Sequence, residues 1–242
     1  MGKQTEGFVF KKDWKYKLEK FFFSIIGDIA YYGWRHPLWL MYQPCEHAIK
    51  GDDLDSLCRL IYEGGLQPGD IFLNRHDHYL STFAIAGDMI HAGLYVGNVP
   101  WKDGKLRHTV IHAMSEGVFA ENAIHFFRAD HGVILRPRLD EKFRMQAATK
   151  CFEFLGRPYD FDFRYTNTQA LYCTELIGAS YDLPEIKEKF KFTLVEQSRL
   201  GIKRTVLKAD NVFLSDVDLI WYSKDVPKMK VYQAYMAQQK PL

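Results

Sequence analysis

Two neighbouring segments of the chain constrain its fold more than any other feature. They read IHAGLYVGN at residues 90–98 and RHTVIHAM at residues 107–114. Apolar side chains alternate with others in both segments, which is the period of strands with one buried face. The connection between them is short, so an antiparallel hairpin is the simplest arrangement. Leu94, Val96 and Ile111 then share one face, which we expect to belong to the core.

The opposite face of this hairpin carries a histidine with a polar partner. If the hairpin closes symmetrically about residues 101–102, His91 lies opposite His112. If a tight two-residue turn forms at residues 103–104, His91 faces Glu116 instead. In both registers the two side chains share a face, with Cβ atoms roughly 5 Å apart. The hairpin therefore offers an imidazole beside a second imidazole or a carboxylate.

Other segments set the fold class. Short apolar runs predict further strands at residues 68–73, 131–139 and 216–222. A helix is expected at roughly 140–155, with Asp140 as its N-cap and Gly156 as its end. Another helix carries Cys173 and ends near Tyr181. Strands grouped between helices predict an α+β fold, in which a small antiparallel sheet packs on helices.

Residues 1–66 are predicted to form a mainly helical N-terminal extension. Residues 21–43 within it are strongly apolar and need a cover, because a large exposed apolar patch is rare on a soluble monomer. We expect this arm to dock on the main domain and to contribute an aromatic wall to its cleft, from Trp34, Trp39 or Tyr42. Peripheral contact with a membrane is the rival explanation.

Composition excludes several classes of function. The 242 residues carry 32 basic and 30 acidic side chains, for a net charge of +2. Binding to a phosphate backbone takes a concentrated basic patch, so we expect no nucleic-acid partner. No apolar run reaches about eighteen residues, so no transmembrane segment is expected. No apolar stretch follows the N-terminal charges, which predicts a cytoplasmic protein with reduced cysteines. The oligomeric state stays open.

Cys173 lies in QALYCTELIGASY, residues 169–181, near the start of its predicted helix. A cysteine on a half-apolar helix is commonly a small core residue. The alternative is a nucleophile, which needs an imidazole to take the thiol proton and a third polar group to orient that imidazole. Unpaired N–H groups at a helix N-terminus also favour a thiolate and can bind an oxyanion.

Two short motifs raise the question of a metal site. They are CEH at residues 45–47 and HDH at residues 76–78. Zinc accepts Cys, His and Asp ligands. HDH follows the first strand in a loop-like stretch, however, and a polar rim near the cleft is the better explanation. None of the four cysteines forms a Cys-x-x-Cys pair. We therefore expect neither a metal nor another cofactor.

Five motifs follow one another along the chain: QPGDIFL, MIHAGLYVG, VIHAMSEGV, LGRPYDFDF and LYCTELI. As an ordered set they resemble the permuted NlpC/P60 proteins, which have a papain-like fold with circularly rearranged segments. They are most similar to the YiiX-type permuted papain-like amidases, with lecithin:retinol acyltransferase-like enzymes as more distant relatives. The resemblance covers residues 67–183 and extends to KADNVFLSDVDLIWY. It implies a catalytic domain over residues 67–242 and leaves residues 1–66 uncovered.

The resemblance also assigns roles to individual residues. It implies that Cys173 is the nucleophile, His91 the base and His112 the orienting third member, with Glu116 in reserve. In the family the strand histidine precedes the helix cysteine, and this sequence has the same order. The third position tends to be Glu in YiiX-like sequences and His in the acyltransferase relatives. His112 therefore gives a mixed signature, which leaves the substrate class open.

The implied activity is that of a thiol hydrolase acting on an amide or ester through an acyl-thioester, without metal or cofactor. Its substrate would be a peptide, a cell-wall peptide or an acyl lipid. Two alternatives stay open. An acyltransferase would pass the acyl group to an amine or alcohol, and a noncatalytic binding module would keep the cleft without turnover.

Overall fold

The computed structural model describes residues 49–77, 87–160, 163, 165, 168–199 and 202–239. The apolar arm at residues 21–43, with Trp34, Trp39 and Tyr42, therefore lies outside the described residues. What is described of the N-terminal extension includes one helix, α2 (Asp52–Tyr62). Within the described ranges, no helix is long and apolar enough to cross a membrane.

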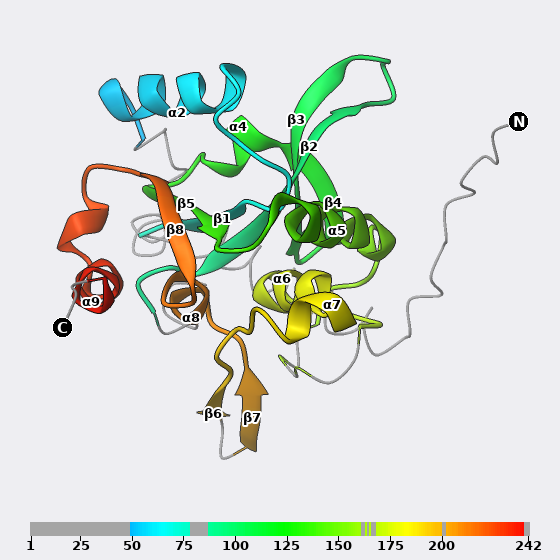
Figure 1. Cartoon of the computed structure of the whole chain (residues 1–242), viewed down its shortest axis with the longest axis vertical. Coiled ribbons are helices and arrows are strands. Elements are labelled where there is room, and N and C mark those ends of the chain that lie inside the picture. Colours follow the sequence, from blue (N-terminus) through cyan, green and yellow to red (C-terminus); the bar gives the residue numbers. More distant parts are fainter. Residues whose placement is uncertain are drawn as a thin grey trace, which may run out of the picture.

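The centre of the molecule is a six-stranded antiparallel sheet with the order β4-β3-β2-β1-β5-β8 (Figure 1). Its strands are β1 (Ile71–Arg75), β2 (His91–Pro100), β3 (Leu106–Met114), β4 (Gly117–Asn122), β5 (His131–Pro137) and β8 (Val217–Tyr222). Helices pack on this sheet without alternating with its strands, so the predicted α+β class is confirmed. The five predicted strands all form, while β4 had no recognised signal.

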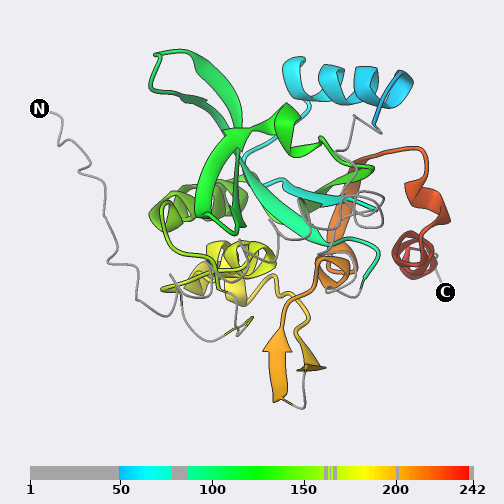
Figure 2. The same cartoon turned by 180° about the vertical axis from the view of Figure 1, so that it is seen from behind.

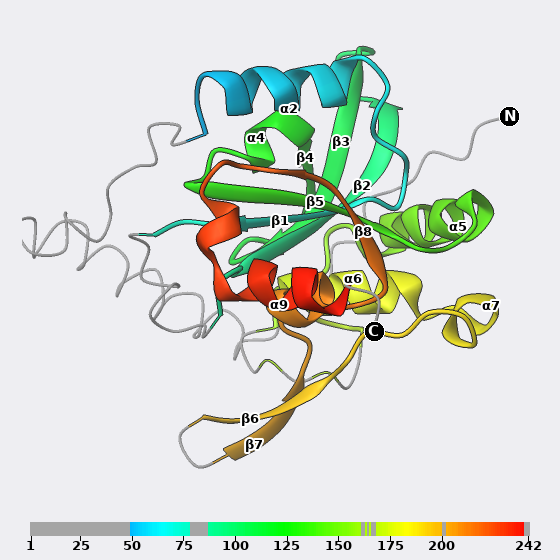
Figure 3. The same ribbon diagram turned by 60° about the vertical axis from the view of Figure 1, so that its left-hand side comes forward.

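Helices cover both faces of the sheet, as Figure 3 shows. They are α2, α4 (Ala123–Phe126), α5 (Glu141–Cys151), α6 (Cys173–Tyr181), α7 (Pro184–Lys187), α8 (Ala209–Phe213) and α9 (Lys230–Gln238), with 3-10 turns at Phe152–Phe154 and Val226–Lys228. Leu94 and Ile111 are fully buried on the face packed by α5 and α6, as expected. Phe72, Tyr95 and Phe126 fill the other face, beneath α2 and α4.

The β2–β3 register differs from both predicted registers. His112 pairs with Gly93, two residues beyond His91, and the pairing shifts by one residue after Tyr95. A β-bulge at this point inserts an extra residue into β2. The hairpin then closes in a loop in which the Lys105 carbonyl accepts a hydrogen bond from the Trp101 N–H. The predictions assumed an unbroken ladder, which is why neither placed His112 correctly.

The helix α5 begins after Asp140 as predicted, but it ends at Cys151, and a 3-10 turn carries the chain on toward Gly156. Asp140 is the N-cap of α5, and Gly156 follows the 3-10 turn with φ 80°. A positive φ is readily adopted only by glycine, which explains the stop. The helix α6 runs from Cys173 to Tyr181, and every residue of it is buried. This burial holds the start of α6 firmly against the sheet.

A separate hairpin, β6 (Val195–Arg199) with β7 (Ile202–Val206), projects from the body of the molecule. Figure 2 shows it, in orange tones, extending away from the main sheet. Its sequence combines charged and polar residues without the alternation that marks a half-buried strand. The hairpin was therefore not predicted.

Candidate thiol–imidazole site

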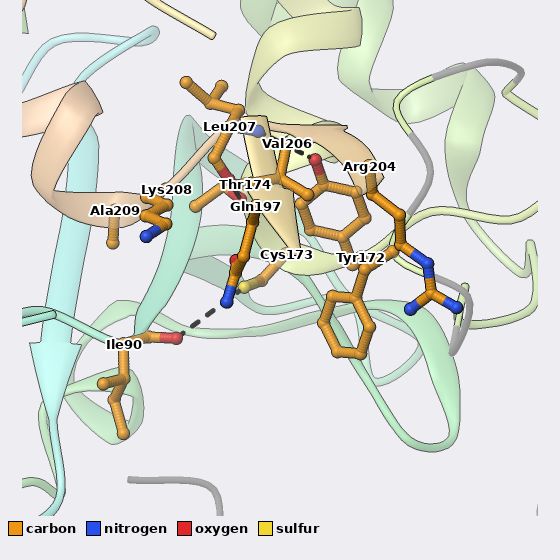
Figure 4. Close-up of a pocket in the computed structure, with 11 residues that line it drawn as sticks. Ile90, Tyr172, Cys173, Thr174, Gln197, Arg204, Val206, Leu207, Lys208 and Ala209 are labelled. Carbon is orange, nitrogen blue, oxygen red and sulfur yellow. Dashed lines mark hydrogen bonds between the residues drawn. The ribbon is translucent and has the colours of Figure 1, made fainter. Parts of the chain in front are cut away.

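Cys173 is the first residue of α6, preceded by Tyr172 as the N-cap. Its Sγ lies 4.0 Å from the Ile90 carbonyl oxygen (Figure 4). The backbone N–H groups of Ala92, Thr174 and Cys173 itself also interact favourably with the thiolate form. The sulfur thus sits between the free N–H groups of a helix N-terminus and the beginning of β2.

The thiol is nevertheless protonated in the resting protein. Burial of Cys173 raises its pKa to about 11, and the three N–H groups lower it only in part. Desolvation disfavours a charge, and this cost outweighs the helix N-terminus. We expected the helix and an imidazolium to favour a standing thiolate. The structure instead presents a neutral thiol.

His91 and His112 come together on the face of the sheet packed by α2 and α4. His91 Nε2 and His112 Nδ1 are 2.9 Å apart and share a hydrogen bond. Gly93 makes this approach feasible, since a Cβ there would lie 2.7 Å from Val110 Cγ2 and 2.8 Å from Phe126 Cε2. The His91 ring stacks on the Phe126 ring at a centroid distance of 5.3 Å.

A carboxylate from β4 extends the pair. Glu121 Oε2 lies 3.3 Å from His112 Nε2, within ion-pair range, although Nε2 makes no hydrogen bond among the described residues. Phe119 pairs with His112 across β3 and β4, so Glu121, two residues on, shares the face of His112. Glu116, the predicted reserve, is exposed in the turn before β4. The carboxylate near His112 is therefore Glu121, which the sequence analysis missed.

These contacts favour one arrangement of protons. When the His112 proton is on Nε2, the nitrogen nearer to Glu121, His112 Nδ1 accepts a hydrogen bond from His91 Nε2–H. His91 Nδ1 is then the nitrogen free to take a proton. Burial, then the neighbouring His112 and His76, hold the pKa of His91 well below 6.5. His91 is therefore neutral near pH 7, as a general base must be.

The sulfur and the imidazoles approach β2 from different sides. The helix α6 packs on the face of Leu94, whereas the His91 ring lies among the aromatic side chains of the other face. Cys173 Sγ contacts the backbone next to His91. This stretch of backbone lies past Gly93 and His112, which form the last pair of the β2–β3 ladder. Among the described residues, no hydrogen bond joins Sγ to an imidazole nitrogen.

A pocket opens over Cys173 with about 580 Å³ of empty space, counting the solvent at its mouth. Residues from three segments far apart in sequence contribute to its wall, among them Tyr172, Thr174, Gln197, Arg204, Leu207 and Lys208 (Figure 4). The Tyr172 hydroxyl accepts a hydrogen bond from the Leu207 N–H, and the Thr174 hydroxyl donates one to the Leu207 carbonyl. These bonds fix the segment after β7 to the start of α6.

Of the HDH motif after β1, the structure describes His76 and Asp77. Asp77 lies 2.6 Å from Arg75 Nε and 2.9 Å from His131 Nε2, so its carboxylate is already engaged. In the described part of the chain, no group of three or more His, Cys, Asp or Glu side chains could hold a metal ion. The CEH motif and His78 lie outside that part.

The chain is similar to known proteins in sequence and in fold. Residues 65–215 match the sequence model of the family described as "Permuted papain-like amidase enzyme, YaeF/YiiX, C92 family". The chain is also similar to the crystal structure of the metalloprotein yiiX from Escherichia coli O157:H7. The identity is 18%, the TM-score is 0.50, and the match covers 63% of this chain and 95% of that one. No curated protein matches the chain.

Proposed function

The chain belongs to the permuted papain-like amidase family, and from that premise we propose that it hydrolyses an amide or ester through an acyl-thioester on Cys173. Family membership supports a hydrolase of the amidase type in general. The observation that carries the specific proposal is the row of Glu121, His112 and His91 side chains, together with a cysteine at a helix N-terminus whose Sγ contacts the carbonyl of Ile90, the residue before His91.

The proposed reaction begins from a neutral pair. As the Cys173 sulfur attacks the substrate carbonyl, the thiol proton moves to His91 Nδ1 and a C–S bond forms. The N–H groups of Ala92, Thr174 and Cys173 are the donors nearest to the developing oxyanion. The carbonyl carbon then loses its amine or alcohol, which takes the proton from His91. Water, activated by His91, cleaves the thioester and restores the thiol.

The neutral resting state agrees with this sequence of steps. A pKa of about 11 for Cys173 and a depressed pKa for His91 make a standing ion pair unfavourable. Proton transfer must then accompany attack, and the imidazolium forms only while substrate is present. His112 stabilises that imidazolium by accepting its Nε2–H, and the Glu121 charge supports His112. The proposal also requires His91 Nδ1 to approach Cys173 Sγ at the end of β2 where His91 lies.

Acylation by an activated ester tests the proposal. Incubation with 4-nitrophenyl acetate should release nitrophenolate and leave one acetyl group on Cys173, located by peptide mass spectrometry. Cys173→Ala should abolish both signals, whereas Cys58→Ala should leave them unchanged because Cys58 lies on α2, away from the pocket. Acetylation confined to Cys58 or Cys151, or turnover that survives Cys173→Ala, would refute a role for Cys173.

Acyl transfer is the second candidate function, and His112 favours it through the resemblance to acyltransferases. Glycine amide added to the same reaction separates the two. Transfer predicts acetylglycine amide in place of free acetate, while hydrolysis predicts acetate throughout. A noncatalytic binding module predicts no turnover with any ester or amide of a peptide and acyl-lipid panel. That result would remove both enzymatic proposals.

A further inference from the structure

The pocket over Cys173 is cationic. Arg204 on β7 and Lys208 just before α8 both line it, and in Figure 4 they flank Cys173 on opposite sides. Among the described residues, no Asp or Glu side chain contributes to the lining. The remaining wall is mostly apolar, which strengthens the field of the two cations inside the pocket.

Arg204 is the pocket cation with an unpaired donor. Its Nε is buried and has no hydrogen-bond partner in the part of the chain that the structure describes. A buried donor left unpaired is unfavourable, so its persistence calls for an explanation. Lys208 already interacts with Asp210, which accepts hydrogen bonds from the Asp88 and Met89 N–H groups. Lys208 therefore adds to the field, while Arg204 keeps an Nε donor without a partner among the described residues.

The β6–β7 register brings an amide to the same place. Gln197 pairs with Arg204 across the hairpin, and both side chains line the pocket. A guanidinium presents parallel N–H donors that match the two oxygens of a carboxylate, and a charge-assisted pair of this kind is stronger than a neutral hydrogen bond. A primary amide beside it can donate a further hydrogen bond to the same group.

We propose that the substrate acylating Cys173 carries a carboxylate close to its scissile carbonyl, and that Arg204 binds this carboxylate from the β6–β7 hairpin. This inference deepens the proposed function and rests on it. Arg204 is then a residue that determines specificity without taking part in bond cleavage. Neutral acyl groups of the same length lack this contact and bind more weakly.

Alkylation of the sulfur tests the inference without needing turnover. Iodoacetate and iodoacetamide form the same S–C bond to Cys173 and release iodide, but only iodoacetate carries a carboxylate. The rate ratio of iodoacetate to iodoacetamide is measured at each cysteine by mass spectrometry. Cys58, half-buried on α2, provides the reference within the same molecule. We expect a ratio at Cys173 about tenfold above that at Cys58, the effect of one charge-assisted hydrogen bond.

Matched variants identify the cation. Arg204→Gln should bring the Cys173 ratio to within about twofold of the Cys58 ratio, and an effect of the lost charge on the thiol itself cancels in the ratio because both reagents share the same thiolate. Lys203→Gln removes the same charge from the exposed neighbouring position, on the other face of the hairpin, and should leave the ratio as in the wild type. A wild-type ratio equal to that of Cys58, or one that Arg204→Gln leaves unaltered, overturns the inference.

The two proposals fail separately. Preserved iodoacetate selectivity without acylation by 4-nitrophenyl acetate would refute the hydrolase and keep the anion site. Acylation of Cys173 without iodoacetate selectivity would keep the hydrolase and refute the carboxylate specificity.

Discussion

Replacing His112 by Leu tests whether the line of polar groups behind His91 supports catalysis. The wild-type bond between His91 Nε2 and His112 Nδ1 is 2.9 Å long and partly buried. It becomes charge-assisted when His91 takes the thiol proton. Such a bond contributes about 1.5–3 kcal/mol, so its loss should lower kcat/KM about 10- to 150-fold. Because the imidazolium forms only during the reaction, the loss should fall mainly on kcat.

Two further variants sharpen this measurement, which follows nitrophenolate release from 4-nitrophenyl acetate. His112→Gln keeps an acceptor for the His91 Nε2–H and should lose less than about tenfold in kcat/KM. His108→Leu removes a histidine from the same strand whose Nδ1 contacts the Tyr95 hydroxyl, outside the site, and should retain wild-type kcat/KM. If His112→Leu keeps an unchanged near-UV circular dichroism spectrum and a kcat/KM within about twofold of the wild type, the orienting role is wrong.

Three other predictions follow from the structure. Because the pKa of His91 is held below 6.5, kcat/KM should stay level from pH 8 down to about pH 6.5 and fall only below that pH. A half-maximal kcat/KM at or above pH 6.5 would contradict the assignment of His91 as the base. The unfolded chain binds that proton more readily than the folded one, so the urea midpoint should also fall as pH drops below about 6.5. Gly93→Ala places a Cβ 2.7 Å from Val110 and should cost about 1–3 kcal/mol in urea unfolding as well as activity, and wild-type values for both would refute the packing argument. Deleting residues 1–48 removes the apolar arm and leaves α2 with its buried Leu57 and Ile61. Docking of the arm on the main domain predicts that the shortened protein is insoluble or less stable. A stable core that loses only liposome binding would favour membrane contact instead.

The sequence was sufficient for features that depend on neighbouring residues. The start of α5 after Asp140 and the span of α6 to Tyr181 agree with the predictions, although α5 ends at Cys151 and a 3-10 turn follows it. Gly156, with φ 80°, ends this segment because a glycine acts on its own turn of the chain. His91 and His112 share a face in both predicted registers and in the observed one. The reason is that the three registers differ by whole steps of two residues, and side chains alternate across a strand with that period.

Tertiary structure decided the rest. The bulge after Tyr95 set the actual register, and the pairing of β4 brought Glu121 rather than Glu116 to His112. Arg204 reaches the pocket through a hairpin whose sequence lacks a strand pattern. The high pKa of Cys173 arises from burial, which depends on everything packed around the start of α6. No local pattern contains this information, because each of these properties depends on residues brought together from distant parts of the chain.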